Sequence, residues 1–66
     1  MKTNQGFLER GRITSITNYG YVVESLDRKG IVTPPIRPIY NEPFSENDIV
    51  LFVLFRDGTG KIICDA

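Results

Sequence analysis

Apolar residues along this chain recur at every second position over short stretches, and no stretch holds a helical period long enough to indicate a helix. Alternation of this kind is typical of β-strands that bury one face, because successive side chains of a strand point to opposite sides of the sheet. Glycine, proline, asparagine and aspartate separate the stretches, as they do at turns. The pattern predicts five strands, at Phe7–Thr17, Tyr19–Ser25, Ile31–Thr33, Ile49–Arg56 and Lys61–Asp65.

The first of these strands is long, and its apolar residues change phase. Strict alternation would place Ile13 and Ile16 on opposite faces of the sheet. A β-bulge, which inserts one extra residue into a strand, would restore the phase. We therefore expect a bulge near Thr14-Ser15 that allows both isoleucines to be buried.

The connections between the predicted strands differ in character. Leu26–Gly30 is a hairpin loop that ends in glycine, and Asp57–Gly60 is a tight hairpin turn. Ser45–Asp48 is a turn before the fourth strand. The segment Pro34–Phe44 contains all four prolines of the chain, which lack the N–H group that a strand or helix needs. It is predicted to be a stiff, extended connection.

Five short strands, with a long first strand and a long connection between the third and the fourth, describe a small closed barrel. The fold class that fits best is all-β, a five-stranded OB-fold barrel, and an SH3-like barrel is the nearest alternative. A chain of 66 residues has room for one domain. We assign residues 7–66 to that domain and residues 1–6 to a loose N-terminal end.

Charge limits the partners that this domain can have. Eight basic and eight acidic residues give a formal net charge of zero. Dedicated nucleic-acid binders usually carry a basic surplus, so any basic patch on this protein must be local.

Cysteine content and hydropathy indicate the compartment. Cys64 is the single cysteine, so no intrachain disulfide can form, and a terminal strand is a typical place for a small, packed thiol. The apolar run Ile49–Phe55 is too short to span a bilayer, and the N-terminus lacks the apolar stretch of a signal peptide. We expect a cytoplasmic protein with no membrane association.

Three motifs carry a resemblance to a known family. Residues 11–23, GRITSITNYGYVV, resemble the opening of the ribosomal-protein-S-one RNA-binding domain. Gly30-Ile31-Val32 resembles the glycine-leucine-valine element of that domain, and the stretch from Phe44 to Ile62 resembles its closing strands. Asn18-Tyr19-Gly20-Tyr21 is also similar to the aromatic signature of the cold-shock domain, which has the same barrel. Both resemblances imply an OB-fold that binds single-stranded RNA or DNA.

The two relatives imply different orientations for the tyrosines. In the cold-shock register Tyr19 and Tyr21 both face outward, and Glu24 points into the core. In the S-one register Tyr19 and Val22 face outward, Tyr21 and Val23 point inward, and Glu24 faces water. Burying an unpaired carboxylate costs several kcal/mol by order of magnitude, which favours the S-one register. We therefore expect Tyr19 to be the exposed stacking ring and Tyr21 to pack inside, with its hydroxyl near the rim.

By resemblance, single-strand binding would combine base stacking with nearby cations. Tyr19 occupies one stacking position of the family, Val22 stands where phenylalanine is preferred, and Thr33 where histidine is frequent. Asp57 and Lys61 keep the family's acid-then-base spacing across the last hairpin. The alternative is that Tyr19 and the charges are ordinary surface. The predicted nucleic-acid-binding residues are Arg12, Tyr19, Tyr21, Val22, Lys29, Thr33, Arg37, Asp57 and Lys61.

The fourth strand departs from the family, which keeps charged residues on its outer face. If Val50, Phe52 and Leu54 fill the barrel, the alternate residues point outward. Such an apolar row normally marks a protein contact, here with a second copy or another protein, unless the N-terminus or the proline segment covers it. The predicted protein interface is Ile49, Leu51, Val53 and Phe55.

No catalytic constellation is recognisable, because the chain has no histidine and no paired nucleophile and base. We expect no enzymatic activity, no metal site and no cofactor. The predicted function is non-catalytic binding of single-stranded RNA or DNA. The runner-up is a protein–protein interaction module or regulator built on an OB barrel that has lost nucleic-acid binding.

Overall fold

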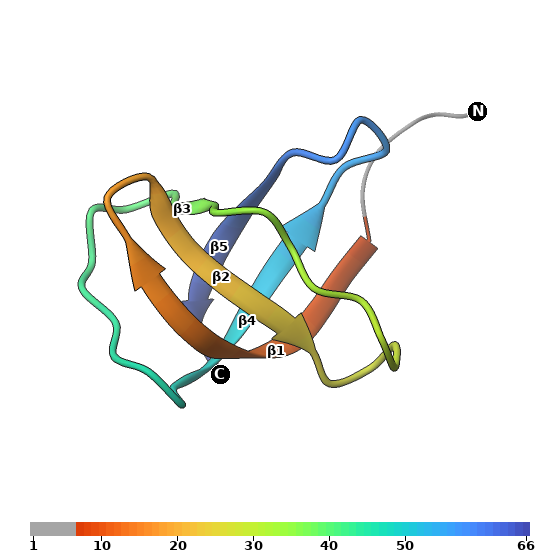
Figure 1. The fold of residues 1–66 in the computed structure, drawn as a ribbon, viewed down its shortest axis with the longest axis horizontal. Helices are drawn as coiled ribbons and strands as arrows, with labels where there is room; N and C mark the ends of the chain where they lie inside the picture. Colours follow the sequence, from red (N-terminus) through yellow and green to blue (C-terminus); the bar gives the residue numbers. More distant parts are fainter. Residues whose placement is uncertain (1–6) are drawn as a thin grey trace.

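The computed structural model describes residues 7–66 and is all-β, with no helix in that range. Its five strands form one sheet in the order β2-β1-β4-β5-β3 (Figure 1). The strands are β1 (Phe7–Thr17), β2 (Gly20–Ser25), β3 (Arg37–Pro38), β4 (Ile49–Leu54) and β5 (Gly60–Asp65). Four of them coincide with predicted strands, with the ends of β2, β4 and β5 shifted by one or two residues.

The sheet curls strongly into a half-barrel, as expected for a small OB-like barrel. All neighbours are antiparallel except β3 and β5, which run parallel. The segment from 31 to 36 lies along the free edge of β2, where it makes two isolated bridges, Tyr21 to Ile36 and Glu24 to Val32. Because this segment continues directly into β3, it connects the two edges of the sheet.

The prediction for the third strand was wrong. Residues Ile31–Thr33 make one isolated bridge, and the strand itself forms at Arg37–Pro38, inside the proline segment. It is only two residues long and lies at the edge of the sheet, a position where a strand tolerates proline. The next residue, Ile39, does donate its N–H to the carbonyl of Ile62, at 2.9 Å.

The expected bulge is present in β1, but only one of the two isoleucines is buried. The pairing with β2 shifts register between Ile13 and Ser15, which confirms the bulge. Ile13 is fully buried, whereas Ile16 is 50% exposed, so its predicted burial was wrong. The reason is that β1 pairs with β4 only as far as Arg12. Beyond that point β1 has β2 alone as a neighbour, and Ile16 lies at the rim of the barrel.

The core fills the interior of the curled sheet with side chains from all parts of the chain. Phe52 and Val50 on β4 are fully buried, and Leu54 packs against the same cluster, as the alternation predicts. Burying each large side chain contributes roughly 1.5–3 kcal/mol. Among residues 8–66, whose burial the structure describes, the buried hydrophobic residues are Ile13, Val23, Ile36, Phe44, Val50, Phe52 and Ile62.

One carboxylate also points inward, which the sequence analysis did not anticipate. Glu9 lies on β1 in phase with Gly11 and Ile13, and its side chain is only 4% exposed. It accepts hydrogen bonds from the Ser25 hydroxyl, at 2.7 Å, and from two guanidinium nitrogens of Arg28. The hydrogen bonds from Arg28 hold the pKa of Glu9 below its usual value, against the opposing effect of burial.

Gly20 permits the sharp bend between β1 and β2. Its φ is +141°, and a Cβ atom there would lie 2.4 Å from the carbonyl oxygen of Ile36. Only glycine fits both the backbone angle and this close approach. The bend sets the direction in which the two flanking tyrosines point.

Candidate nucleic-acid interface

Tyr19 stands at the tip of the turn between β1 and β2. Thr17 organises this turn, because its hydroxyl accepts the Tyr19 N–H at 3.0 Å and donates to the Gly20 carbonyl at 3.0 Å. The ring itself is 76% exposed. A fixed backbone under an exposed ring gives a rigid surface on which a base can stack.

The ring borders a groove of about 410 Å³, which we call the tyrosine groove. The strand pairing of β3 with β5 sets Arg37 directly beside Lys61, and both line the groove with Tyr19. Three predicted binding residues from three separate parts of the chain therefore meet here. The remaining lining residues are Pro34, Pro35, Ile36, Gly58, Thr59 and Gly60.

The two cations of the tyrosine groove differ from three arginines elsewhere in the described chain. Arg10, Arg12 and Arg28 each form an ion pair with a carboxylate. Within residues 7–66, Arg37 and Lys61 have no acidic partner. They are like charges on directly paired strand positions, an arrangement that costs stability unless an anion lies between them.

Asp57, also a predicted site residue, is engaged by its own turn. Its carboxylate accepts hydrogen bonds from the hydroxyl of Thr59 at 2.7 Å and from the N–H of the same residue at 3.0 Å. These bonds, the hydroxyl bond foremost, lower the pKa of Asp57, so its negative charge is stabilised. Three residues that follow Asp57 line the tyrosine groove: Gly58, Thr59 and Gly60.

Two predicted residues support the site from inside. Tyr21 is half-buried, its ring meets Phe44 edge-on with centroids 5.7 Å apart, and its hydroxyl accepts the Phe44 N–H at 3.1 Å. This is the inward orientation expected from the S-one register. Thr33 is only 3% exposed, and its hydroxyl accepts the Val23 N–H at 3.0 Å. Thr33 is thus enclosed in the barrel, where its hydroxyl holds the β2 backbone.

Three other predicted residues lie away from the groove lining. The Arg12 guanidinium donates to Glu24 at 3.0 Å and to the side-chain oxygen of Asn47 at 2.8 Å, so it is already satisfied. Lys29 is exposed in the loop after β2, whereas Tyr19 precedes β2, so the two residues lie beyond opposite ends of the same strand. Val22 is half-buried, and its carbonyl accepts the Thr14 hydroxyl at 3.2 Å.

The outer face of β4 carries the predicted protein interface. Ile49, Leu51 and Val53 are half-buried on this face, and Phe55 is exposed just beyond the strand. On β1, Leu8 is 64% exposed directly opposite Val53. The apolar row therefore extends sideways onto β1.

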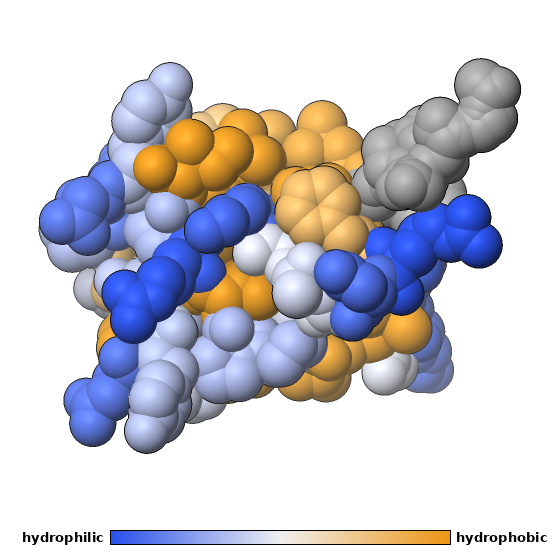
Figure 2. All heavy atoms as spheres, turned by 90° about the horizontal axis from the view of Figure 1, so that it is seen from above, coloured by the Kyte–Doolittle hydropathy of each residue, from blue (hydrophilic) through white to orange (hydrophobic). Residues whose placement is uncertain are grey.

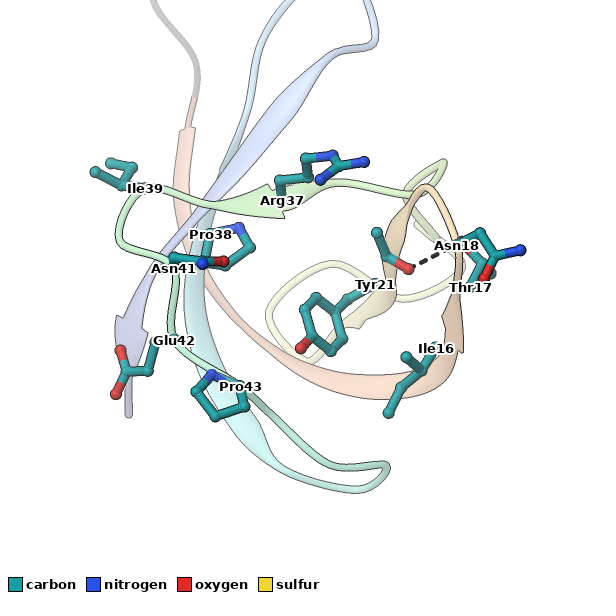
Figure 3. A pocket seen from close by; sticks show the side chains of 11 residues that line it. Ile16, Thr17, Asn18, Tyr21, Arg37, Pro38, Ile39, Asn41, Glu42 and Pro43 are labelled. Carbon is teal, nitrogen blue, oxygen red and sulfur yellow. Dashed lines mark hydrogen bonds between the residues drawn. The ribbon is translucent and has the colours of Figure 1, made fainter.

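A second hollow, of about 480 Å³, lies on the other side of Arg37, and we call it the asparagine hollow (Figure 3). Asn18 and Asn41 line it together with Tyr21. Tyr40, next to Asn41, is 73% exposed. Sequence analysis missed Tyr40 and Asn41, because the only signal was an aromatic residue within a polar part of the proline segment.

The face that carries β3 exposes hydrophobic and hydrophilic side chains next to one another (Figure 2). A surface of this kind suits a ligand with flat apolar rings and a charged backbone. Among residues 7–66, no three histidine, cysteine, aspartate or glutamate side chains are placed to hold a metal ion. The same residues contain no helix long and apolar enough to cross a membrane.

Comparison of the chain with protein-family models, curated proteins and solved structures finds no match. The resemblance to S-one and cold-shock domains thus rests on the motifs quoted above.

Proposed function

We propose that this protein is a non-catalytic binder of single-stranded RNA or DNA, and that the tyrosine groove is its binding site. The observation that carries the proposal is the meeting of an exposed aromatic ring with two unpaired cations: Tyr19, Arg37 and Lys61. A base stacked on Tyr19 would contribute ~1–3 kcal/mol, whatever its identity. Arg37 and Lys61 would bind the adjoining phosphates.

Local charge supports the proposal despite a net charge of zero. Three of the arginines are neutralised by carboxylates on the protein itself, and no acidic residue lines the tyrosine groove. A phosphate between Arg37 and Lys61 would relieve the repulsion between these two neighbours. The groove is therefore a place where an anion stabilises the fold as well as being bound.

Fluorescence anisotropy with labelled oligothymidylate and oligouridylate tests the proposal. We expect affinity that falls as salt rises, and Tyr19→Ala to weaken binding roughly 5- to 100-fold. Tyr19→Phe, which keeps the ring, should bind nearly as well as the unmodified protein. Leu26→Ala, another exposed residue but in the loop after β2, serves as the control. Absence of salt-sensitive binding to both oligonucleotides would refute the proposal.

A second candidate function is self-association through the outer face of β4. The specific observation is that Leu8 and Phe55, both exposed, extend the half-buried row of Leu51 and Val53 into one apolar patch. Pairing two such faces about a two-fold axis is the commonest assembly of like chains.

Sedimentation analysis tests this second candidate. The double variant Leu51→Lys, Val53→Lys should remain folded and monomeric, while the unmodified protein sediments as a dimer. Ile16→Lys, at an exposed apolar position on the rim, is the matched control and should leave the dimer intact. An unmodified protein that stays monomeric at high concentration would contradict the proposal.

A further inference from the structure

The tyrosine groove and the asparagine hollow share one residue. Arg37 lines both, so this residue separates one from the other. A single strand that leaves the tyrosine groove on that side passes Arg37 and enters the hollow. The phosphate joining two successive nucleotides would then lie at the arginine, which suits bidentate contact with its two oxygens.

The size and lining of the hollow fit a nucleotide base. Its volume of about 480 Å³ falls within the usual range of small-ligand pockets, roughly 300–1,000 Å³. The ring of Tyr21 lies in the middle of the view in Figure 3, and the Asn41 side chain points toward it. Pro38, Pro43 and Ile16 add apolar surface around them.

Two polar groups in the hollow retain hydrogen-bonding capacity. The Tyr21 hydroxyl accepts the Phe44 N–H, which leaves its own hydrogen available to donate. The amide of Asn41 makes no hydrogen bond among the residues that the structure describes, so it can both donate and accept. Glu42 is the one acidic residue of the lining, and its carboxylate is directed away from the hollow (Figure 3).

Tyr40 adds a second exposed ring within the segment that lines this hollow. It lies between two lining residues, Ile39 and Asn41, and its exposure of 73% is close to the 76% of Tyr19. Tyr19 lines the tyrosine groove, Tyr40 is the chain neighbour of two residues that line the asparagine hollow, and Arg37 lines both. Single-strand binders combine cations along the strand with several aromatic rings on which successive bases stack.

We propose that the asparagine hollow is a second nucleotide subsite, in which Asn41 and the Tyr21 hydroxyl bind a base edge and Tyr40 stacks on the adjacent base. This inference rests on the proposed function, because it extends the same bound strand. It predicts that the protein binds a strand longer than the tyrosine groove alone can hold.

A length series tests the inference by fluorescence anisotropy. The probes are oligothymidylates of about three and about eight nucleotides, which span one subsite and both subsites. Tyr19→Ala should weaken binding of both lengths, whereas Tyr40→Ala and Asn41→Asp should weaken only the longer strand, by roughly tenfold. Tyr40→Phe, which keeps the ring, is the matched control. Circular dichroism of each variant checks that the barrel is retained.

The outcomes separate the two proposals. If Tyr40→Ala and Asn41→Asp leave both lengths unaffected while Tyr19→Ala weakens them, the second subsite is refuted and the tyrosine groove stands. If the Tyr40→Ala variant weakens both lengths equally, there is one shared site and the inference is wrong. If the unmodified protein binds neither length, the proposed function and the inference fall together.

Discussion

Two groups of cations on this small barrel differ in whether a carboxylate of the protein neutralises them. Along β1 and the loop after β2, the arginines pair with carboxylates: Arg10 with Asp27, Arg12 with Glu24, and Arg28 with Glu9. Across β3 and β5, by contrast, Arg37 and Lys61 lie beside each other with no acidic partner in the described chain. A formal net charge of zero conceals this difference.

The role of a cation depends on whether a carboxylate of the protein already neutralises it. A paired arginine that binds phosphate must first release its carboxylate, and the cost is highest where that carboxylate is buried, as at Glu9. The ion pairs of Arg10 and Arg28 connect the loop after β2 to strand β1. Unpaired cations have no such cost, and neighbouring like charges are stabilised when an anion binds between them.

Glu9→Gln removes the ion pair between Glu9 and Arg28 and should destabilise the protein by about 1–3 kcal/mol. The amide keeps the shape of the side chain but loses the charge that holds the Arg28 guanidinium, and it leaves buried polar groups poorly matched. Urea denaturation measures the change. Glu46→Gln, in an exposed turn, is the control and should change stability by less than about 0.5 kcal/mol. Oligonucleotide affinity should be unaffected, and a large loss of affinity would contradict the division of roles.

Removing the cations of the tyrosine groove should weaken oligonucleotide binding and leave the stability of the protein unchanged or slightly higher. Arg37→Ala and Lys61→Ala should each weaken oligonucleotide binding, to similar extents for different sequences, and lower the slope of log affinity against log salt by about 0.7. Stability should stay constant or rise slightly, because a like-charge neighbour is removed. Titrations at several salt concentrations, with urea denaturation alongside, measure both. Unchanged salt slopes would mean that neither cation binds phosphate.

Acid should lower the stability of the protein by protonating Glu9 and so removing its ion pair with Arg28. Because the folded-state pKa of Glu9 lies below its ordinary value of 4.5, the unfolded chain binds the proton more tightly than the folded one. The stabilisation is complete above pH 4.5 and is lost as the pH falls through the depressed folded-state pKa. Urea denaturation between neutral pH and about pH 3 should show this loss. The loss should be smaller in Glu9→Gln, and an equal loss in both proteins would show that another group is responsible.

Arg12→Ala should have the smallest effect. Its ion pair with Glu24 is substantially exposed, with about two fifths of each side chain accessible, so we expect a stability change of ~0.5 kcal/mol or less. It lies outside the lining of the tyrosine groove, and the variant should bind oligonucleotides like the unmodified protein. A loss of affinity equal to that of Arg37→Ala would extend the binding surface onto β1.

Local patterns predicted most of the barrel. Alternation located β1, β2, β4 and β5 and the inward residues of β4, since the two-residue period of a strand depends only on adjacent residues. The phase change in β1 also predicted its bulge. The third strand was misplaced because the proline segment pairs with β5 through only two residues, which leaves no pattern in the sequence.

The candidate site was predicted less completely. Tyr19, Arg37 and Lys61 were named from the sequence and meet at one groove, but Thr33 was also named and is buried. The exposure of Thr33 depends on the segment from 31 to 36 lying along β2, a contact between parts of the chain that no local pattern records.

The all-β class, most of the strands and the outward direction of Tyr19 could be predicted from the sequence alone. Alternation is a local property of a strand, and the cost of burying an unpaired Glu24 carboxylate selects one orientation of the tyrosines. Which cations lack an acidic partner among residues 7–66 depends instead on the tertiary structure. Each ion pair joins residues at least twelve positions apart in the chain, and the pairing of β3 with β5 brings Arg37 beside Lys61. Charge pairing over such separations follows from the folded path of the chain, and here it distinguishes the cations that fasten the barrel from those open to a ligand.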